Sequence, residues 1–293
     1  MLDQLLDAPL LEHRAAELAG AARIRYVLDQ RFRYEYDAPI AQLHHRLVVL
    51  PPIRHGNQYR REHRVDVAGA AVRRRSRADR DGNPVVHFAA PHVEQHVEFR
   101  VAAVVDQVHA DRPYTLPRAA LGNPRWRNAT ALTRPDDHIR ELARSATEHL
   151  ADPTERAHAL THAAHLAVRY EHGITDVATT AAQAVRLGRG VCQDSAHVLL
   201  AMCHAVGAPA RYVSGHLLGQ GGTHAWVEIL VPRERAAVAL PLDPCNDRPA
   251  GPGYLTIATG RDYRAVAPTS GYFSGTSAGR LTASRRVGVV AAA

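Results

Sequence analysis

The chain has 293 residues, 46% of them hydrophobic, which is enough to bury the core of one large domain or of two domains of ordinary size. Its formal net charge is +7, but all 36 Lys and Arg positions are Arg, and these are scattered rather than interleaved with aromatics, which argues against specific nucleic-acid binding. No apolar run is long enough to span a membrane and the chain begins with acidic rather than basic residues, so we expect a cytoplasmic protein without a signal peptide or membrane partner.

The first part of the chain is predicted to be rich in β-strands. Residues 1–22 are rich in Ala and Leu and favour a helix or a loosely held N-terminal extension. From residue 23 onward, apolar segments alternate with turn signals such as Asp81-Gly82-Asn83, which predicts an antiparallel sheet or sandwich over residues 23–110. The predicted strands cover residues 24–36, 44–52, 61–69, 83–91 and 96–108.

The second half of the chain mixes helices and strands. A Pro-containing stretch at 111–134 is predicted to be a linker ahead of an α+β core at 135–270, and residues 271–293 a C-terminal strand segment. Asp136 is placed to begin a helix that runs to about residue 150, and Pro153 occupies the first turn of the next helix.

Three histidines in that second helix raise the question of a metal site. His158, His162 and His165 fall at i, i+4 and i+7 and therefore share one helix face. That face lies opposite Leu160 and Ala164, which should point at the core, and no Cys or carboxylate joins the histidines at ligand spacing. We therefore favour solvent-facing histidines and expect no metal and no cofactor.

Cys192 is the leading candidate for a catalytic residue. Gly188 and Gly190 allow a tight turn, after which apolar residues recur at helical spacing, so Cys192 opens a buried helix. The free amide groups and the dipole at a helix N-terminus favour a thiolate, the nucleophilic form of cysteine. Cys203 lies roughly 16 Å further along the same helix, too far for a disulfide, and is interpreted as a buried apolar residue. We expect reduced thiols throughout.

A general base and an orienting carboxylate follow downstream. The segment THAWVEILV alternates like a strand that begins at His224, with Trp226 on the same side, and the next apolar stretch ends in Asp243. If the two strands pair in antiparallel fashion, Asp243 lies beside His224. The order of Cys, His and Asp matches what a thiol nucleophile, its base and the base's partner require.

These residues resemble the transglutaminase-like superfamily, in its bacterial form with a β-rich N-terminal region ahead of a transglutaminase core. The resemblance spans residues 23–290 and rests on DRDGNPVVHF, GITDVATTAAQAVRLGRGVCQDSAH, APARYVSGHL, THAWVEI, LDPCN and ATGRDYRAVAPTSGYFSG, of which GVCQD, HAWVE and LDP in this order are specific. It implies a papain-like α+β core in which Cys192, His224 and Asp243 match the catalytic triad of the family.

Two departures from the family pattern lie beside this triad. Ser195 stands where the family commonly has Phe, and the Trp that commonly precedes the LDP block is absent. Cys245 replaces a frequent Thr and is interpreted either as a buried apolar residue, which we favour, or as a second thiol able to reach the site. We assign Gln193, Ser195, Trp226 and Cys245 as candidates for the substrate pocket, and the departures predict an altered acyl pocket.

The predicted function is acyl transfer from an amide, in a glutamine side chain or a peptide bond, through a cysteinyl acyl-enzyme. Release by water makes the enzyme a peptidase or amidase, and release by an amine makes it a transglutaminase; the sequence leaves this open, as it does the substrate, the acceptor and the oligomeric state. The alternatives are a non-catalytic binding or assembly module that kept the fold, and an arylamine-type acyltransferase, which would depend on acyl-CoA.

Overall fold

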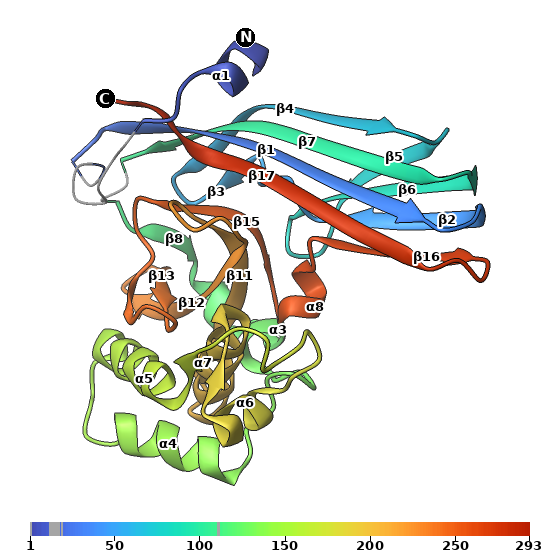
Figure 1. The fold of residues 1–293 in the computed structure, drawn as a ribbon. Coiled ribbons are helices and arrows are strands. Elements are labelled where there is room, and N and C mark those ends of the chain that lie inside the picture. Colours follow the sequence, from blue (N-terminus) through green and yellow to red (C-terminus); the bar gives the residue numbers. More distant parts are fainter. Residues whose placement is uncertain (1, 12–17, 19, 110–111) are drawn as a thin grey trace.

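The computed structural model describes residues 2–11, 18, 20–109 and 112–293. A β-rich N-terminal part lies against a smaller core of helices and one antiparallel sheet (Figure 1). The predicted α+β class, with β-rich sheets ahead of a core of helices and an antiparallel sheet, is therefore confirmed. Among the described residues, no helix has the length and apolar character needed to cross a membrane.

The N-terminal part is a sandwich of two antiparallel sheets. Sheet A has the strand order β17 (Gly279–Ala292), β1 (Arg23–Tyr36), β7 (His96–Val108), β4 (Gln58–Ala68) and β3 (Arg54–His55). Sheet B has the order β16 (Thr269–Ser274), β2 (Ile40–Leu47), β6 (Pro84–Val93) and β5 (Arg73–Ala78).

Alternation of apolar residues explains why these two sheets pack together. Phe32 and Phe99 of sheet A meet Leu43 and Phe88 of sheet B in one buried cluster, because every second residue of each strand points inward. On the other face of sheet A, helix α1 (Leu2–Asp7) packs its two buried leucines. The rest of the predicted extension, residues 12–17 and 19, lies outside the described residues.

The chain returns to the sandwich at its end. Strand β17 pairs with β1 along its length, from Ile24 opposite Ala292 to Tyr36 opposite Gly279, and β16 pairs with β2. The segment predicted as a linker carries strand β8 (Tyr114–Pro117), a 3-10 helix η1 (Arg118–Gly122) and helix α3 (Pro124–Arg127). Because β8 pairs with the sheet of the core, this segment adds to that sheet as well as joining the two parts.

The core consists of one buried helix between other helices and a sheet. Sheet C has the order β14 (Arg248–Pro249), β13 (Ala236–Asp243), β12 (His224–Arg233), β11 (Ala210–Leu217) and β15 (Tyr254–Gly260). The helices are α4 (Asp137–Thr147), α5 (Pro153–Ala167), α6 (Ala181–Leu187), α7 (Cys192–Ala205) and the short α8 (Tyr263–Val266), and β9 (Arg169–Tyr170) pairs in parallel with β10 (Arg189–Gly190).

Helix α7 occupies the centre of this core. Its residues from Ala196 to Cys203 are fully buried in the main apolar cluster, which also contains Ala225, Val227 and Ile229 from one face of β12. The opposite face of β12 therefore carries the alternate residues, beginning with His224. The predicted helix starts are also found: the Asp136 side chain accepts a hydrogen bond from the Ile139 amide at 3.0 Å.

Candidate active site

The N-terminus of α7 is held by a tight turn that presents Cys192. Gly188 ends α6 in the left-handed conformation with φ of 63°, which few other residues adopt. At Gly190 a Cβ atom would lie 2.6 Å from the Asp194 carboxylate, so only glycine lets that side chain fold back. Asp194 then accepts hydrogen bonds from the Val191 amide at 2.8 Å and from the Thr175 hydroxyl at 2.6 Å. This fixes the first turn of the helix and the position of Cys192.

His224 and Asp243 come together through the pairing of β12 with β13. The antiparallel register places Val227 opposite Leu242, so the first residue of β12 lies near the last residue of β13. His224 Nε2 and Asp243 Oδ2 are 2.7 Å apart, and the two residues are 3% and 0% exposed. Cys192 lies beside the same imidazole, whose pKa its thiol helps to raise. Since Nε2 is held by Asp243, Nδ1 is the nitrogen left for the thiol.

The charges of this group favour a protonated imidazole. Burial opposes protonation of His224, but the hydrogen bonds and charges of Asp243 and Cys192 outweigh it and raise the pKa of His224 to about 9. Burial likewise works against ionisation of Asp243, and hydrogen bonds from His224, Asn246 and Tyr254 outweigh it, so the Asp243 pKa lies below its ordinary value. An imidazolium between a carboxylate and a thiol stabilises the thiolate needed for nucleophilic attack.

Two residues absent from the sequence-based assignment hold Asp243 in place. The Tyr254 hydroxyl donates to Asp243 Oδ2 at 2.8 Å, and the Asn246 side-chain amide donates to the same oxygen at 2.7 Å. The backbone N–H of Cys245 donates to Asp243 Oδ1 at 2.9 Å. The position of Asn246 in the LDPCN block was a usable signal. Tyr254 begins β15, which β12 and β11 separate from β13 in the sheet, so nothing in the local sequence indicates that its side chain reaches Asp243.

Four residues were assigned to the substrate pocket, and most of them are buried. Gln193 and Ser195 are 8% and 1% exposed, and the Gln193 side chain donates to the Asp176 carbonyl at 3.4 Å. Ser195 thus lies inside the packed core around α7 rather than on an open surface. Trp226 is 1% exposed, and its ring lies 6.3 Å from that of His224, where it shields the imidazole from one side.

Cys245, the fourth candidate, is half-buried and lies next to the triad. All three cysteines are free thiols. Burial raises the pKa of Cys245 to about 12, with a further contribution from the charges of Asp243 and Cys192. Near neutral pH Cys245 is therefore a thiol and not a competing nucleophile.

Tyr170 is an exposed residue beside the nucleophile that sequence reasoning missed. It is 50% exposed and lies on β9, which pairs with the strand leading to Cys192. Its pKa is raised by partial burial and by the charges of Cys192 and Cys245. Its hydroxyl is 2.9 Å from His172 Nε2. A two-residue strand gives little sequence signal, because it is too short for alternation to be visible.

The three histidines of α5 make separate contacts. His158 and His162 are exposed, and His162 Nδ1 lies 2.7 Å from Asp247 Oδ2. His165 Nδ1 lies 3.1 Å from the Pro244 carbonyl. Leu160 is fully buried on the opposite face, as predicted.

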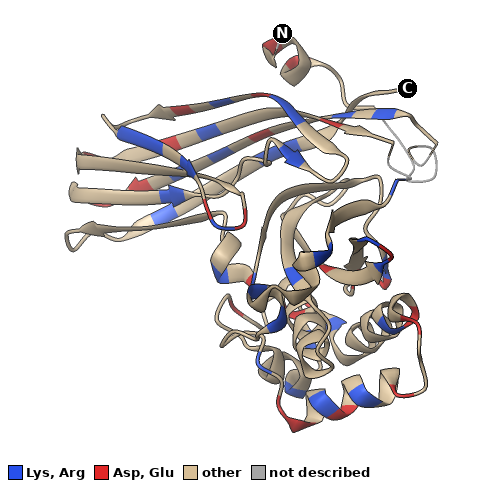
Figure 2. Cartoon of the chain, turned by 180° about the vertical axis from the view of Figure 1, so that it is seen from behind, with Lys and Arg blue, Asp and Glu red and all other residues tan. Residues whose placement is uncertain are grey.

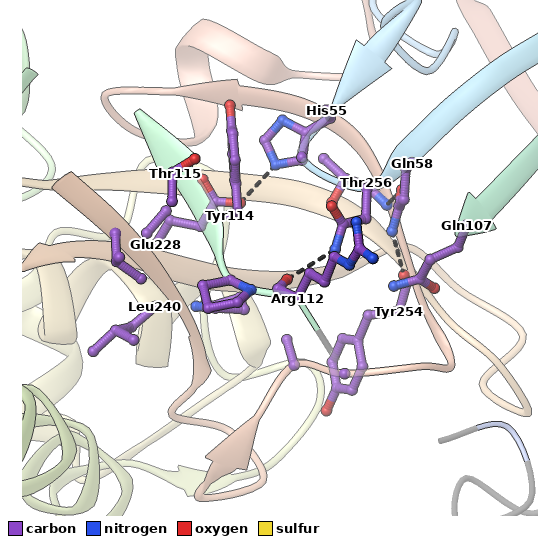
Figure 3. Close-up of a pocket in the computed structure, with 18 of the residues that line it drawn as sticks. His55, Gln58, Gln107, Arg112, Tyr114, Thr115, Glu228, Leu240, Tyr254 and Thr256 are labelled. Carbon is purple, nitrogen blue, oxygen red and sulfur yellow. Dashed lines mark hydrogen bonds and ion pairs between the residues drawn. The ribbon is translucent and has the colours of Figure 1, made fainter. Parts of the chain in front are cut away.

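A cavity of about 490 Å³ lies behind the triad, between sheet A and sheet C (Figure 3). Trp226 and Tyr254 form the wall nearest the triad, and Glu228 continues the same face of β12. Glu228 forms a buried ion pair with Arg211, at 2.6 Å, and its other oxygen lies 2.6 Å from His55 Nε2 on β3. Glu228 thus ties the N-terminal sandwich to the catalytic core.

A cysteine that opens a buried helix, beside a hydrogen-bonded histidine and aspartate pair on an antiparallel sheet, defines a transglutaminase-type core. The transglutaminase-like superfamily profile matches residues 140–238, and that of the bacterial transglutaminase-like N-terminal region matches residues 26–106. The chain belongs to the transglutaminase-like superfamily, with the bacterial N-terminal region ahead of the transglutaminase core. The resemblance inferred from the sequence is thereby confirmed.

A solved structure shares the fold, and curated relatives share part of the sequence. A proposed cysteine protease from Cytophaga hutchinsonii has a crystal structure that superimposes with a TM-score of 0.75 at 20% identity, over 92% of this chain and 91% of that chain. An uncharacterised protein of Mycobacterium leprae is 36% identical over 37% of this chain and 41% of its own length. An uncharacterised protein of Mycobacterium tuberculosis is 34% identical over 35% of this chain and 36% of its own length. The chain thus spans well under half of the length of these curated relatives.

Selective alkylation would report the state of the three thiols. We expect iodoacetamide to modify Cys192 first near neutral pH, because the imidazolium and the helix N-terminus stabilise its thiolate. Burial raises the pKa of Cys203 and of Cys245, so both should react slowly in the folded chain. Peptide mapping by mass spectrometry after short exposures measures the three rates, with urea-unfolded chain as the control. Equal rates in the folded chain would contradict an activated Cys192.

Proposed function

We propose that this chain catalyses acyl transfer from an amide through a thioester on Cys192. The observation that carries the proposal is the buried hydrogen bond of 2.7 Å between His224 and Asp243, beside a cysteine at the N-terminus of α7. This arrangement supplies a nucleophile, a proton carrier and a group that orients the carrier, which together are what thiol-dependent acyl transfer needs.

The first half of the proposed reaction forms the acyl-enzyme. The Cys192 thiolate attacks the amide carbon and forms the carbon–sulfur bond, while the carbonyl oxygen takes up the negative charge. The Cys192 backbone N–H is at the first position of α7, where backbone amides have no hydrogen-bond partner within the helix. It can therefore stabilise that oxyanion. As the carbon–nitrogen bond breaks, His224 gives its proton to the departing nitrogen, which leaves as ammonia or an amine.

The second half decides the class of product. His224, now neutral, removes a proton from water or from an amine, which attacks the thioester and releases the Cys192 thiolate. Water yields an acid, as in a peptidase or amidase, and an amine yields a new amide, as in a transglutaminase. Asp243 keeps the imidazole oriented through both halves. A peptide or protein amide is the substrate class that we propose, with an amine as the possible acceptor.

A product assay on glutaminyl peptides distinguishes these outcomes. The full chain is incubated with a peptide library with and without a fluorescent primary amine, and products are identified by mass spectrometry. We expect peptide hydrolysis, side-chain deamidation or amine conjugation with the wild type, and none of them with Cys192→Ala. An identical product set from both proteins, or no product from either while an acyl-CoA donor does support turnover, would overturn the proposal.

A further inference from the structure

Sheet B carries a cluster of positive charge that has no acidic partner. Its four strands contain no Asp or Glu and five Arg residues: Arg46, Arg73, Arg74, Arg75 and Arg77. No ion pair joins any of these five to a described residue. Figure 2 shows positively charged positions on neighbouring strands of this part of the molecule. Most of these side chains are exposed, so their charges act on the solvent in front of the sheet.

Sheet A shows that the same chain pairs arginines with acids elsewhere. Arg25 lies 2.7 Å from Asp106 on the neighbouring strand, and Arg61 reaches the same carboxylate at 3.0 Å from the other side. Arg100 lies 2.8 Å from Asp29 in the same way. Cross-strand pairs of opposite charge stabilise a sheet, and like charges in facing positions destabilise it. The absence of acidic residues in sheet B is therefore a specific property of that sheet and not of the whole chain.

Four of the five arginines lie on the outer face of sheet B. The register places Arg46 of β2 opposite His87 of β6, and His87 opposite Arg75 of β5, so that the three side chains form one row across the sheet. Arg73 and Arg77 point to the same side as Arg75 by strand alternation. We call these five residues the basic face: Arg46, Arg73, Arg75, Arg77 and His87. Together they line a hollow of about 1080 Å³.

The pKa values of the basic face reflect burial first and neighbouring charges second. Burial lowers the pKa of Arg46, Asp79 acts in the opposite direction, and the charge of Arg77 adds a smaller lowering. Burial and the charges of Arg77 and Arg46 also lower the pKa of His87. Asp79 is the acidic side chain near this group, and its oxygens are occupied by the amides of the turn, including the Asn83 side chain at 2.8 Å. A bound anion would reduce the repulsion among these positive charges.

The basic face adjoins the catalytic core. Arg46 donates a hydrogen bond to the Ala265 carbonyl of α8 at 2.9 Å, and α8 follows β15 of the core sheet. Val48 and Val85, which border the basic face, are buried in the apolar cluster of the core. The basic face therefore lies on the side of the sandwich that contacts the core.

The shape and the aromatic content of the face favour a polypeptide over a nucleic acid. Proteins that bind single-stranded nucleic acid offer several exposed rings on which successive bases stack. Among the described residues lining this hollow, Tyr272 is the one large aromatic ring that is mostly exposed, and His44 already stacks on it at 4.9 Å. Alternate arginines on β5 instead match alternate carboxylates of an extended peptide, because both repeat every two residues at about 6.6 to 6.8 Å.

We propose that the basic face docks an acidic, extended segment of a polypeptide, with the guanidinium groups of Arg46, Arg73, Arg75 and Arg77 pairing with its carboxylates. That this polypeptide is also the one whose amide is attacked rests on the proposed function. Docking on sheet B selects protein substrates by an acidic sequence distant from the reacting amide, and holds them near the core.

Binding of a labelled peptide to the full chain tests this. Fluorescein-labelled decaglutamate is titrated with the wild type, and anisotropy reports binding at low and at moderate salt. Arg75→Glu/Arg77→Glu should weaken binding at least about tenfold, equal to 1.4 kcal/mol. The control Arg31→Glu/Arg235→Glu makes the same charge change at exposed positions away from the basic face and should leave the affinity within about twofold. Cys192→Ala should bind as the wild type does, so a failure of the catalytic proposal would not affect this result.

Four outcomes would overturn the docking proposal. Absence of decaglutamate binding by the wild type would do so, as would equal loss in both double variants, which indicates only a net-charge effect. Unchanged binding by Arg75→Glu/Arg77→Glu would mean that the arginines of β5 merely guard an exposed sheet edge against association. Tighter binding of an oligothymidylate of ten nucleotides that displaces decaglutamate from the wild type would identify the face as a nucleic-acid surface instead.

Discussion

Asp243→Asn should lower kcat/KM by about 10²- to 10⁴-fold while leaving the protein folded. The carboxylate accepts hydrogen bonds on both oxygens, from His224, Tyr254 and Asn246 at Oδ2 and from the Cys245 amide at Oδ1. An asparagine amide has one oxygen, so its NH₂ group must face one of these sets of donors. The imidazole then loses both its orientation and the negative charge that stabilises its protonated form.

The same variant should change the pH dependence in a defined direction. The proposed active form has a protonated His224, whose pKa is raised to about 9, so kcat/KM should fall as the pH rises through about 9. Without the charge of Asp243 the histidine loses its proton at lower pH, and the alkaline limb should shift downward. Rate profiles on the best peptide of the library measure this, and the iodoacetamide rate of Cys192 provides a readout that needs no substrate.

Asp247→Asn is the matched control for this experiment. Asp247 lies four residues further along the chain and pairs with His162 on the exposed face of α5, outside the triad. The same chemical change there should leave kcat/KM within about twofold and the alkaline limb in place, because a surface ion pair with histidine contributes little. If Asp243→Asn and Asp247→Asn behaved alike, Asp243 would not be the group that orients His224.

The sequence was sufficient to predict the strands with strong alternation and the position of Cys192 at the start of a buried helix. Strands β1, β6 and β7 alternate inward apolar residues and were predicted nearly to their ends. Cys192 was predicted because two glycines and an apolar stripe of helical period are local signals that a sequence displays directly. Strand β5, RRRSRA, was missed because all its residues are exposed, so that no apolar period marks it as a strand.

Contacts between distant segments were beyond sequence reasoning. Tyr254 supports Asp243 because β15 follows β11 in the sheet, and nothing in the local sequence fixes that order. The arginines of β5 and β2 are 27 or more positions apart in the chain, and their common face exists only because β6 lies between the two strands. Arginines that are scattered in the sequence therefore form a cluster on one face of the fold. The net charge of +7 thus includes a local concentration of positive charge.

Glu228→Gln should destabilise the fold by about 3 to 5 kcal/mol, because it leaves the Arg211 guanidinium buried without a counter-charge. Glu228 and Arg211 are 3% and 5% exposed, so water cannot replace the lost partner. Burial acts against ionisation of Glu228, but Arg211 and His55 outweigh it and lower its pKa to about 2. A carboxyl group with a depressed pKa stabilises the fold above its ordinary pKa, and this contribution is lost as the pH falls toward 2.

Urea unfolding of two further variants isolates the cost of the unpaired charge. Arg211→Met/Glu228→Leu removes both charges and replaces them with apolar side chains of similar size, so it should recover most of the lost free energy of unfolding. Glu35→Gln makes the same substitution in a surface pair with Arg280 and should hardly move the urea midpoint, because solvent screens that pair. A Glu228→Gln urea midpoint equal to that of Glu35→Gln would show that the stability of the fold does not require a negative charge between His55 and Arg211. The expected order, with Glu228→Gln far below the other two, would establish that the buried Arg211 guanidinium destabilises the fold when its counter-charge is removed.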